Sequence, residues 1–187
     1  VFEVGSLAMA GDAHAIAVSG SIAYIVDSDV LRVIDVSTPS APAELGSCPL
    51  PRVGDSVAFS RGHAYVACRQ EGLRVIDVSV PTNPVEVNDL GTGWTNAALA
   101  VAAAGDYLYV AGITDLEVLD IHDPANPQPV GAADIAGVAR SIAVDGGFAV
   151  VAEDTAGLSV FRIPSLLLDD LESGDLSRWS AAVGVAP

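Results

Sequence analysis

The stretch Leu31-Arg32-Val33-Ile34-Asp35-Val36-Ser37-Thr38-Pro39 decides the fold, because it returns at a nearly fixed spacing along the chain. Residues 73–81 repeat it almost letter for letter, residues 116–124 keep a looser form, and residues 158–164 hold a last copy without the aspartate. Successive copies lie 42, 43 and 42 residues apart. A period in this range is typical of propellers, solenoids and repeat arrays.

Each repeat carries short runs rich in Val, Ile and Tyr, separated by Gly, Ser, Asp or Pro. Such runs, with a turn every 8 to 12 residues or so, predict antiparallel β-strands. The expected strands are residues 14–19, 22–27, 31–36 and 43–48; 55–60, 63–68, 73–78 and 85–90; 97–102, 107–112, 116–121 and 128–133; and 140–144, 148–153 and 158–163. The fourth repeat stops one strand short, and residues 2–7, which match residues 44–48, are expected to form the missing strand.

The predicted fold is all-β: a β-propeller of four-stranded antiparallel blades, with four blades in residues 1–164. The strands are apolar on both faces, so each sheet needs a neighbour on each side, which a radial arrangement supplies. Two alternatives stay open. Either residues 2–7 close a four-bladed ring, or the chain is the C-terminal part of a larger propeller, which the absence of a start signal at Val1 favours. Residues 165–187 are expected to form an acidic C-terminal tail.

The composition excludes several classes of partner. The formal net charge is −16, and all eight basic residues are Arg. This acidity argues against binding to nucleic acid or to anionic lipid, whose phosphates it repels. No apolar run approaches the roughly 18 residues that a membrane helix needs. Cys48 and Cys68 form either one disulfide or two isolated small core residues, since the other repeats have no counterparts.

The repeats resemble a known family. Residues 22–27 (Ile-Ala-Tyr-Ile-Val-Asp) and 31–36 (Leu-Arg-Val-Ile-Asp-Val), followed by Pro39 and Pro42, are similar to the LVIVD repeat of bacterial and archaeal proteins, and the likeness covers residues 3–163. The resemblance implies a β-propeller on an exported or cell-surface protein, an adhesion or other interaction role, and no defined catalytic residues. Residues 171–180 are similar to short C-terminal segments of exported bacterial proteins, although Leu171 stands where that pattern has Phe.

Positions at which the repeats disagree identify a candidate binding rim. In a propeller the first strand of each blade lines the central channel, so the start of strand one and the end of strand two meet at one end of the ring. Variable polar residues on a rigid repeated frame are where a binding site is built. The first-strand position is His14, Asp55, Ala97 and Arg140, and the second-strand position is Asp27, Cys68, Gly112 and Glu153.

The loop of residues 91–96 enters the same rim, and its Trp94 could stack on a sugar or an aromatic ligand. The alternative is a rim of solvated charges with Trp94 packed on a neighbouring blade. The predicted binding residues are His14, Asp27, Asp55, Trp94, Arg140 and Glu153.

The best-repeated polar residues are Asp35, Asp77 and Asp120. Repetition around a ring separates them widely, so we expect each carboxylate to play a structural role by accepting hydrogen bonds within its own loop. The segment Asp27-Ser28-Asp29 hints at Ca²⁺ but lacks the remaining oxygen ligands in sequence. No metal site and no cofactor are therefore predicted.

Three functions are compatible with these residues. The first is a non-catalytic interaction module, extracellular or on a bacterial surface, that binds a protein or glycan partner through one rim. The second is a hydrolase with Asp55, Glu153 and Asp27 as acid/base candidates and His14 as a proton carrier, by analogy from fold alone. The third is a structural spacer without a ligand, and an incomplete ring is expected to self-associate in order to cover its open blade faces.

Overall fold

The computed structural model describes residues 1–91 and 97–163 of the 187-residue chain. Its strands form four antiparallel sheets, each made from one repeat. The first sheet holds β1 (Ala13–Ser19), β2 (Ile22–Asp27), β3 (Val30–Asp35) and β4 (Ala43–Pro49). The second holds β5 (Ser56–Ser60), β6 (His63–Ala67), β7 (Leu73–Asp77) and β8 (Val85–Leu90). The third holds β9 (Ala100–Ala104), β10 (Tyr107–Ala111), β11 (Asp115–Asp120) and β12 (Gln128–Asp134). The fourth holds β13 (Ala139–Asp145), β14 (Phe148–Glu153) and β15 (Gly157–Arg162).

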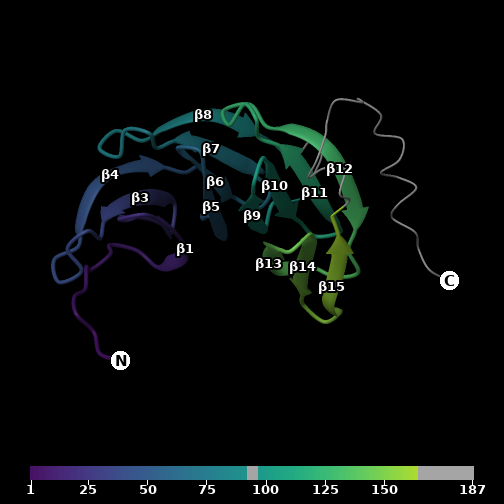
Figure 1. The fold of residues 1–187 in the computed structure, drawn as a ribbon, viewed down its shortest axis with the longest axis horizontal. Coiled ribbons are helices and arrows are strands. Elements are labelled where there is room, and N and C mark those ends of the chain that lie inside the picture. The colour runs from purple at the N-terminus through teal and green to yellow at the C-terminus, as the bar shows by residue number, and fades with distance from the viewer. Residues whose placement is uncertain (92–96, 164–187) are drawn as a thin grey trace.

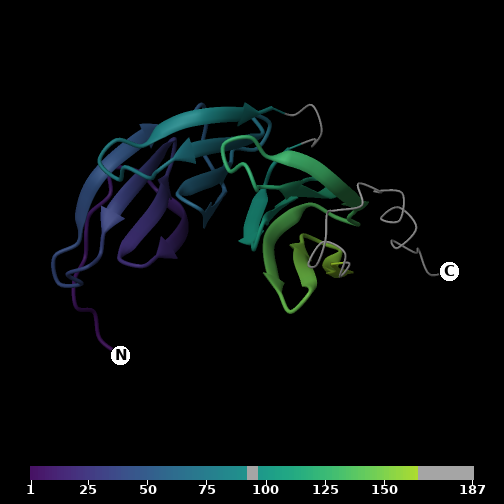
Figure 2. The ribbon, with the colours of Figure 1, turned by 45° about the horizontal axis from the view of Figure 1, so that its top comes forward.

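The sheets are arranged radially as the four blades of a β-propeller, which confirms the predicted fold class. The inner strands β1, β5, β9 and β13 lie side by side in chain order. Figures 1 and 2 show the blades following one another around an arc, with the first and fourth sheets at its two ends. The arc is therefore a part of a ring, and its inner face is built by the first strand of every repeat.

The core lies between successive blades. One apolar cluster joins the first and second sheets, another joins the second and third, and another joins the third and fourth. Tyr24 and Phe59, for example, stack face to face across the first of these interfaces, with ring centroids 4.7 Å apart. Within the described part of the chain, no such cluster joins the first sheet to the fourth.

Tight hairpins connect the inner two strands of each blade. At the β5–β6 turn, Arg61 and Gly62 both have positive φ, 49° and 77°. Two consecutive residues of this kind form the type I′ turn, whose twist matches that of the flanking strands. Gly146 and Gly147 do the same at the β13–β14 turn, with φ of 57° and 82°.

Two strand predictions were wrong. Residues 2–7 are not a strand in the structure, and the fourth sheet accordingly has three strands within residues 1–91 and 97–163. The physical reason is the open arc, because residues 2–7 precede the first sheet at one end while β15 lies at the other end. The third repeat's first strand is β9, Ala100–Ala104, and not residues 97–102. Ala98 instead pairs with Arg69 of the second repeat, so the strand begins later than its run of small apolar residues suggests.

Cys48 and Cys68 are free and buried. Of the two alternatives, a disulfide or two isolated core residues, the structure therefore shows the second. Burial raises the pKa of the Cys68 thiol to about 12. Across residues 1–91 and 97–163, no helix is long and apolar enough to cross a membrane.

Candidate binding site at one rim

One rim of the arc carries a pocket of about 340 Å³ between the second, third and fourth sheets. The second and third sheets each contribute the residue that precedes their first strand and the turn between their second and third strands, and the fourth sheet contributes the start of β13. The lining residues are Asp55, Arg69, Gln70, Leu99, Ile113, Val138, Ala139 and Arg140.

The strand pairing shows that Asp55, Leu99 and Arg140 hold equivalent positions. Val57, Val101 and Ile142 hold the same place in their blades, since they lie opposite Val66, Val110 and Val151 of the second strands. Asp55, Leu99 and Arg140 each come two residues before them. The position assigned to Ala97 from the sequence therefore belongs to Leu99, because β9 starts later than expected. With that correction, the first-strand position of three successive blades lines one pocket.

Asp55 binds the side chain of Arg69, a pocket residue that sequence reasoning missed. Arg69 Nε lies 2.7 Å from Asp55 Oδ2, and Arg69 Nη2 donates to Oδ1 at 2.7 Å. The backbone of Arg69 is held by two hydrogen bonds with Ala98, which tie the second blade to the third. This pairing with Asp55 raises the pKa of the Arg69 guanidinium further above its ordinary value.

Arg140 occupies a bulge, because the β13–β14 register shifts between Ala139 and Ser141. Its Nη2 donates to Asp154 Oδ2 at 2.8 Å, and both side chains are exposed. His14 holds the equivalent bulged position in β1, is exposed, and belongs to the first sheet at the far end of the arc. The structure thus brings Asp55 and Arg140 to one pocket and leaves His14 outside its lining.

Asp27 and Glu153 end the second strands of the first and fourth blades, and both are buried. Asp27 Oδ2 accepts a hydrogen bond from Arg32 Nε at 2.6 Å, which raises the Arg32 pKa. Glu153 Oε2 accepts one from the backbone N–H of Gly137 at 2.6 Å. Neither residue lines the rim pocket, and the two carboxylates belong to separate blades, the first and the fourth. Trp94 lies outside the described residues.

The repeated aspartates lie at the opposite end of the blades, where each is the last residue of strand three. Asp35 Oδ1 accepts from the backbone N–H of Ser37 at 2.8 Å, and Asp77 Oδ1 accepts from that of Ser79 at 2.8 Å. Hydrogen bonds from the side chain and then from the backbone of Ser37 and Ser79 stabilise the charged carboxylates and lower the pKa of Asp35 and Asp77. Asp120 accepts from the backbone N–H of His122 at 2.7 Å.

The residues described by the structure contain no group of three or more Asp, Glu, His or Cys side chains that could hold a metal ion. In the segment Asp27-Ser28-Asp29, the Asp27 carboxylate is occupied by the Arg32 guanidinium.

Glu117 is a second residue that sequence reasoning missed. It lies in β11 at the position that Arg32 and Arg74 hold in the first two blades, and it is buried. Burial, with a smaller contribution from the charge of Asp115, raises the pKa of Glu117 to about 7.

A signal for the missed pocket residues was present in the sequence. The turns between strands two and three differ between repeats as much as the strand ends do: Ser28-Asp29, then Arg69-Gln70-Glu71, then Ile113-Thr114, then Asp154-Thr155-Ala156. Applying the same rule of variable positions to these turns identifies Arg69, Gln70 and Ile113.

Comparison with known proteins agrees with this architecture. The family model described as LVIVD repeat matches residues 10–49, 51–92, 97–134 and 136–163. No match was found among the curated proteins.

Solved structures of low sequence identity share the fold. The computationally designed Ika4 protein is 17% identical with a TM-score of 0.67, and the match covers 88% of this chain and 99% of Ika4. The Cps50 (Swd1) β-propeller domain of Myceliophteria thermophila is 13% identical with a TM-score of 0.70, over 86% of this chain and 55% of that one. A functionally unknown protein from Desulfotomaculum acetoxidans DSM 771 is 14% identical with a TM-score of 0.71, over 82% and 52%. The chain therefore spans nearly all of Ika4 and about half of the other two.

Proposed function

This chain belongs to the LVIVD repeat family, and we propose that it is a non-catalytic interaction module that binds a protein or glycan partner through the rim pocket. The observation that carries the proposal is the convergence of Asp55, Leu99 and Arg140 on that pocket. These are equivalent positions of three blades at which the repeats differ, whereas the surrounding frame repeats.

The size and chemistry of the pocket support this role. A volume of about 340 Å³ is at the lower end of the range for small-ligand sites, which suits one sugar unit or one protein side chain. Leu99, Ile113 and Val138 supply apolar surface, and the guanidinium groups of Arg69 and Arg140 supply hydrogen-bond donors. An apolar surface bordered by donors matches a ligand with one apolar face and several oxygen acceptors.

The hydrolase alternative has less support from the placement of its residues. Both oxygens of Asp55 are engaged by Arg69, while Asp27 and Glu153 are buried in the first and fourth sheets. A glycosidic mechanism requires two carboxylates that flank one bond, and only Asp55 of the three lines the pocket.

We place the module outside the cell or on a bacterial surface. The support is the likeness of residues 171–180 to C-terminal segments of exported proteins, together with an acidic composition that favours solubility. Fractionation of cells that express the native gene checks this placement, and recovery of the protein only from the cytosol would contradict it.

A glycan array and a pull-down with extracellular proteins test the binding role, using the wild type, Arg69→Ala and Arg140→Ala. Arg61→Ala is the matched control, because Arg61 also forms an exposed ion pair, with Asp106, but lies at the other end of β5. We expect a bound glycan or protein to be lost or weakened in the two pocket variants and kept in the control. Binding that is equal in all four proteins would remove the pocket from consideration.

A further inference from the structure

The fourth sheet exposes apolar side chains at positions that the earlier sheets bury. Leu158 and Val160 of β15 are 65% and 57% exposed. Their equivalents in the first sheet, Leu31 and Val33, are fully buried against the second sheet. The fourth sheet thus ends in a face that is built to receive a further blade.

The first sheet exposes the complementary face. Ile16 and Val18 of β1 are 62% and 61% exposed. Their equivalents in the second sheet, Val57 and Phe59, pack against the first sheet. Each interface inside the chain joins one face of these two kinds to the other, so the fourth sheet's open face matches the first sheet's open face.

The segment before β1 is placed as the outer strand of a missing blade. A Cβ atom added at Gly5 would overlap the backbone oxygen of Pro39, in the loop after β3. Gly46 of β4 stands in the same relation to Pro81, in the loop after β7 of the next blade. Residues 2–7 therefore rest on the first blade as β4 rests on the second, and the fourth sheet has no such outer strand among the residues that the structure describes.

We propose that two copies of this chain join into one eight-bladed ring. The first sheet of each copy packs on the fourth sheet of the other, at two equivalent interfaces. Residues 2–7 of each copy add to the edge of β15 that no described strand of the other copy pairs with, and they complete its fourth blade. A second copy is the fitting occupant because it presents, from the same repeat, the surface that already pairs three times inside the chain.

The register of the added strand follows from the first blade. There Leu31, Arg32 and Val33 of β3 lie opposite Cys48, Ser47 and Gly46 of β4. Transferring this pairing through the repeat places Leu7 opposite Leu158, Ser6 opposite Ser159 and Gly5 opposite Val160 of the other copy. Closure within one chain is less favoured, because the arc holds residues 2–7 and β15 at opposite ends (Figure 1).

The mass in solution of the 187-residue chain tests the proposal. Light scattering after size exclusion is expected to show twice the chain mass of 19.0 kDa. Ile16→Asp and Val160→Asp each place a charge in both interfaces, and each is expected to weaken the dimer more than about tenfold, because a buried unpaired charge is costly. The matched control is Val80→Asp, since Val80 is 56% exposed and lies in the loop after β7, away from both open faces.

A disulfide identifies the strand exchange. We expect a mixture of the Ser6→Cys and Ser159→Cys variants, once oxidised, to give a covalent dimer with one chain of each kind, which neither variant gives alone to the same extent. The native thiols of Cys48 and Cys68 are buried and do not compete. The Ser6→Cys/Ser159→Cys double variant is expected to run as a covalent dimer on a non-reducing gel.

Three results would overturn the proposal. A mass of one chain at every concentration would show that the open faces await another occupant, such as further blades of a longer protein. A disulfide formed within a single chain of the double variant would show that the ring closes on itself with four blades. A dimer that survives both aspartate substitutions would show that the copies associate through another surface.

Discussion

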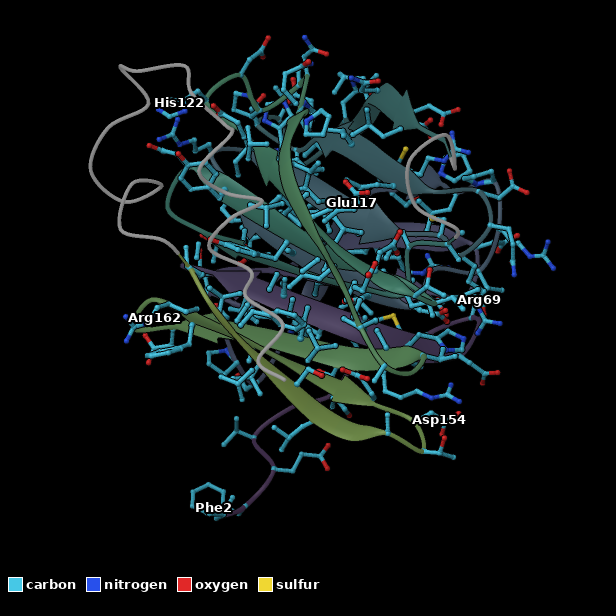
Figure 3. All side chains as sticks on the ribbon, turned by 90° about the vertical axis from the view of Figure 1, so that its right-hand side faces the viewer. Phe2, Arg69, Glu117, His122, Asp154 and Arg162 are labelled. Carbon is cyan, nitrogen blue, oxygen red and sulfur yellow. The ribbon has the colours of Figure 1, made fainter. Side chains whose placement is uncertain are left out.

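Arg69 binds Asp55 through two contacts in the lining of the rim pocket, with Nε 2.7 Å from Oδ2 and Nη2 2.7 Å from Oδ1. The pair joins the start of one strand to the turn that follows the next, so it orients a guanidinium towards the pocket without removing it from solvent. Figure 3 shows Arg69 and Asp154 at one end of the molecule, and His122 and Arg162 at the other. The pocket residue Arg69 and the loop that follows β11 thus lie at opposite ends of the blades.

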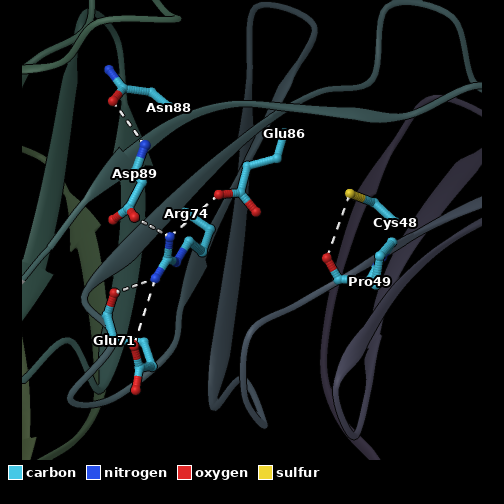
Figure 4. A network of polar contacts seen from close by, with 7 residues as sticks. All are labelled: Cys48, Pro49, Glu71, Arg74, Glu86, Asn88 and Asp89. Atoms are coloured by element: carbon cyan, nitrogen blue, oxygen red, sulfur yellow. Dashed lines mark hydrogen bonds and ion pairs between the residues drawn. The ribbon is translucent and has the colours of Figure 1, made fainter.

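Two arginines of the second blade are expected to differ in their contribution to stability. Arg74 is buried and contacts Glu86 at 3.3 Å, Asp89 at 2.5 Å and the backbone oxygen of Glu71 at 3.0 Å (Figure 4). Arg74→Ala leaves these acceptors without their cation and is expected to lower the free energy of unfolding by about 2 kcal/mol or more. Arg69→Ala removes an exposed pair and is expected to cost roughly 0–1 kcal/mol. Urea unfolding measures both, and equal losses would contradict the contrast.

Asp77 is expected to stabilise the loop after β7 through charged hydrogen bonds from the side chain and the backbone of Ser79. Asp77→Ala leaves the backbone N–H of Ser79 without its acceptor, and we expect a loss of about 1 kcal/mol at neutral pH. The folded-state pKa of Asp77 lies below its ordinary value of 3.8. The benefit is therefore complete above that ordinary value and is lost as the pH falls through the lower, folded-state pKa. Urea unfolding of wild type and variant should show a difference that shrinks in strong acid, and a constant difference would contradict the assignment.

The fold could be predicted from the sequence because the same pattern of strands and turns occurs in each of the four repeats. Residues 31–39 recur in every blade, so a weak signal for each strand is supported three more times. The rim was harder to predict, because a pocket between three blades depends on how far each turn reaches towards its neighbours. The Ala98–Arg69 bridge shows this: it joins two blades through backbone hydrogen bonds, which the side-chain pattern of the repeats does not reveal, and β9 begins only after it.

Glu117 shows a second limit of sequence reasoning. The letter pattern marks it as a variable position of strand three, where Arg32 and Arg74 stand in other blades. Burial in β11 alone turns it into a titrating group near neutral pH. Whether a variable polar residue is solvated or enclosed depends on its neighbours in space, which the repeat does not reveal.

Glu117 is expected to make the protein less stable as the pH rises. Its ordinary pKa is 4.5 and its folded-state pKa is about 7, so the unfolded chain loses this proton first. The free energy of unfolding therefore falls between about pH 4.5 and pH 7 and levels off above. Glu117→Gln keeps the side chain neutral and is expected to raise stability by about 1–3 kcal/mol at pH 8 relative to wild type, with little change at pH 4. Thermal or urea unfolding across this range measures it, with the exposed carboxylate variant Asp29→Asn as the control, and a gain that does not depend on pH would contradict it.

The proposed dimer is expected to tighten as salt is added. Each chain carries a formal charge of −16, and joining two chains doubles that charge on one particle, while the open faces are apolar. Raising the ionic strength from about 0.01 M to about 1 M shortens the screening length from roughly 30 Å to roughly 3 Å. The electrostatic repulsion between the two acidic chains then weakens, while the stabilisation from burying the apolar open faces remains. Sedimentation velocity over this range should show a falling dissociation constant, and a rising one would indicate an interface held by ion pairs between the copies.

The affinity of the two copies for each other is expected to depend on Gly5, because its lack of a side chain lets residues 2–7 lie against the first blade. A Cβ atom at this position overlaps the backbone oxygen of Pro39, so Gly5→Ala should push the segment away from the path that leads to β15 of the other copy. Because residues 2–7 are exposed and outside every sheet of the single chain, the unfolding temperature of the dissociated chain should stay close to that of wild type. The matched control is Gly91→Ala, since the nearest atom to a Cβ there is Asp89 Oδ1 at 3.8 Å. We expect Gly5→Ala to raise the dimer dissociation constant by about tenfold, which corresponds to losing roughly 1.4 kcal/mol, and Gly91→Ala to leave it unchanged. An equal effect of both substitutions would mean that residues 2–7 do not take part in the association.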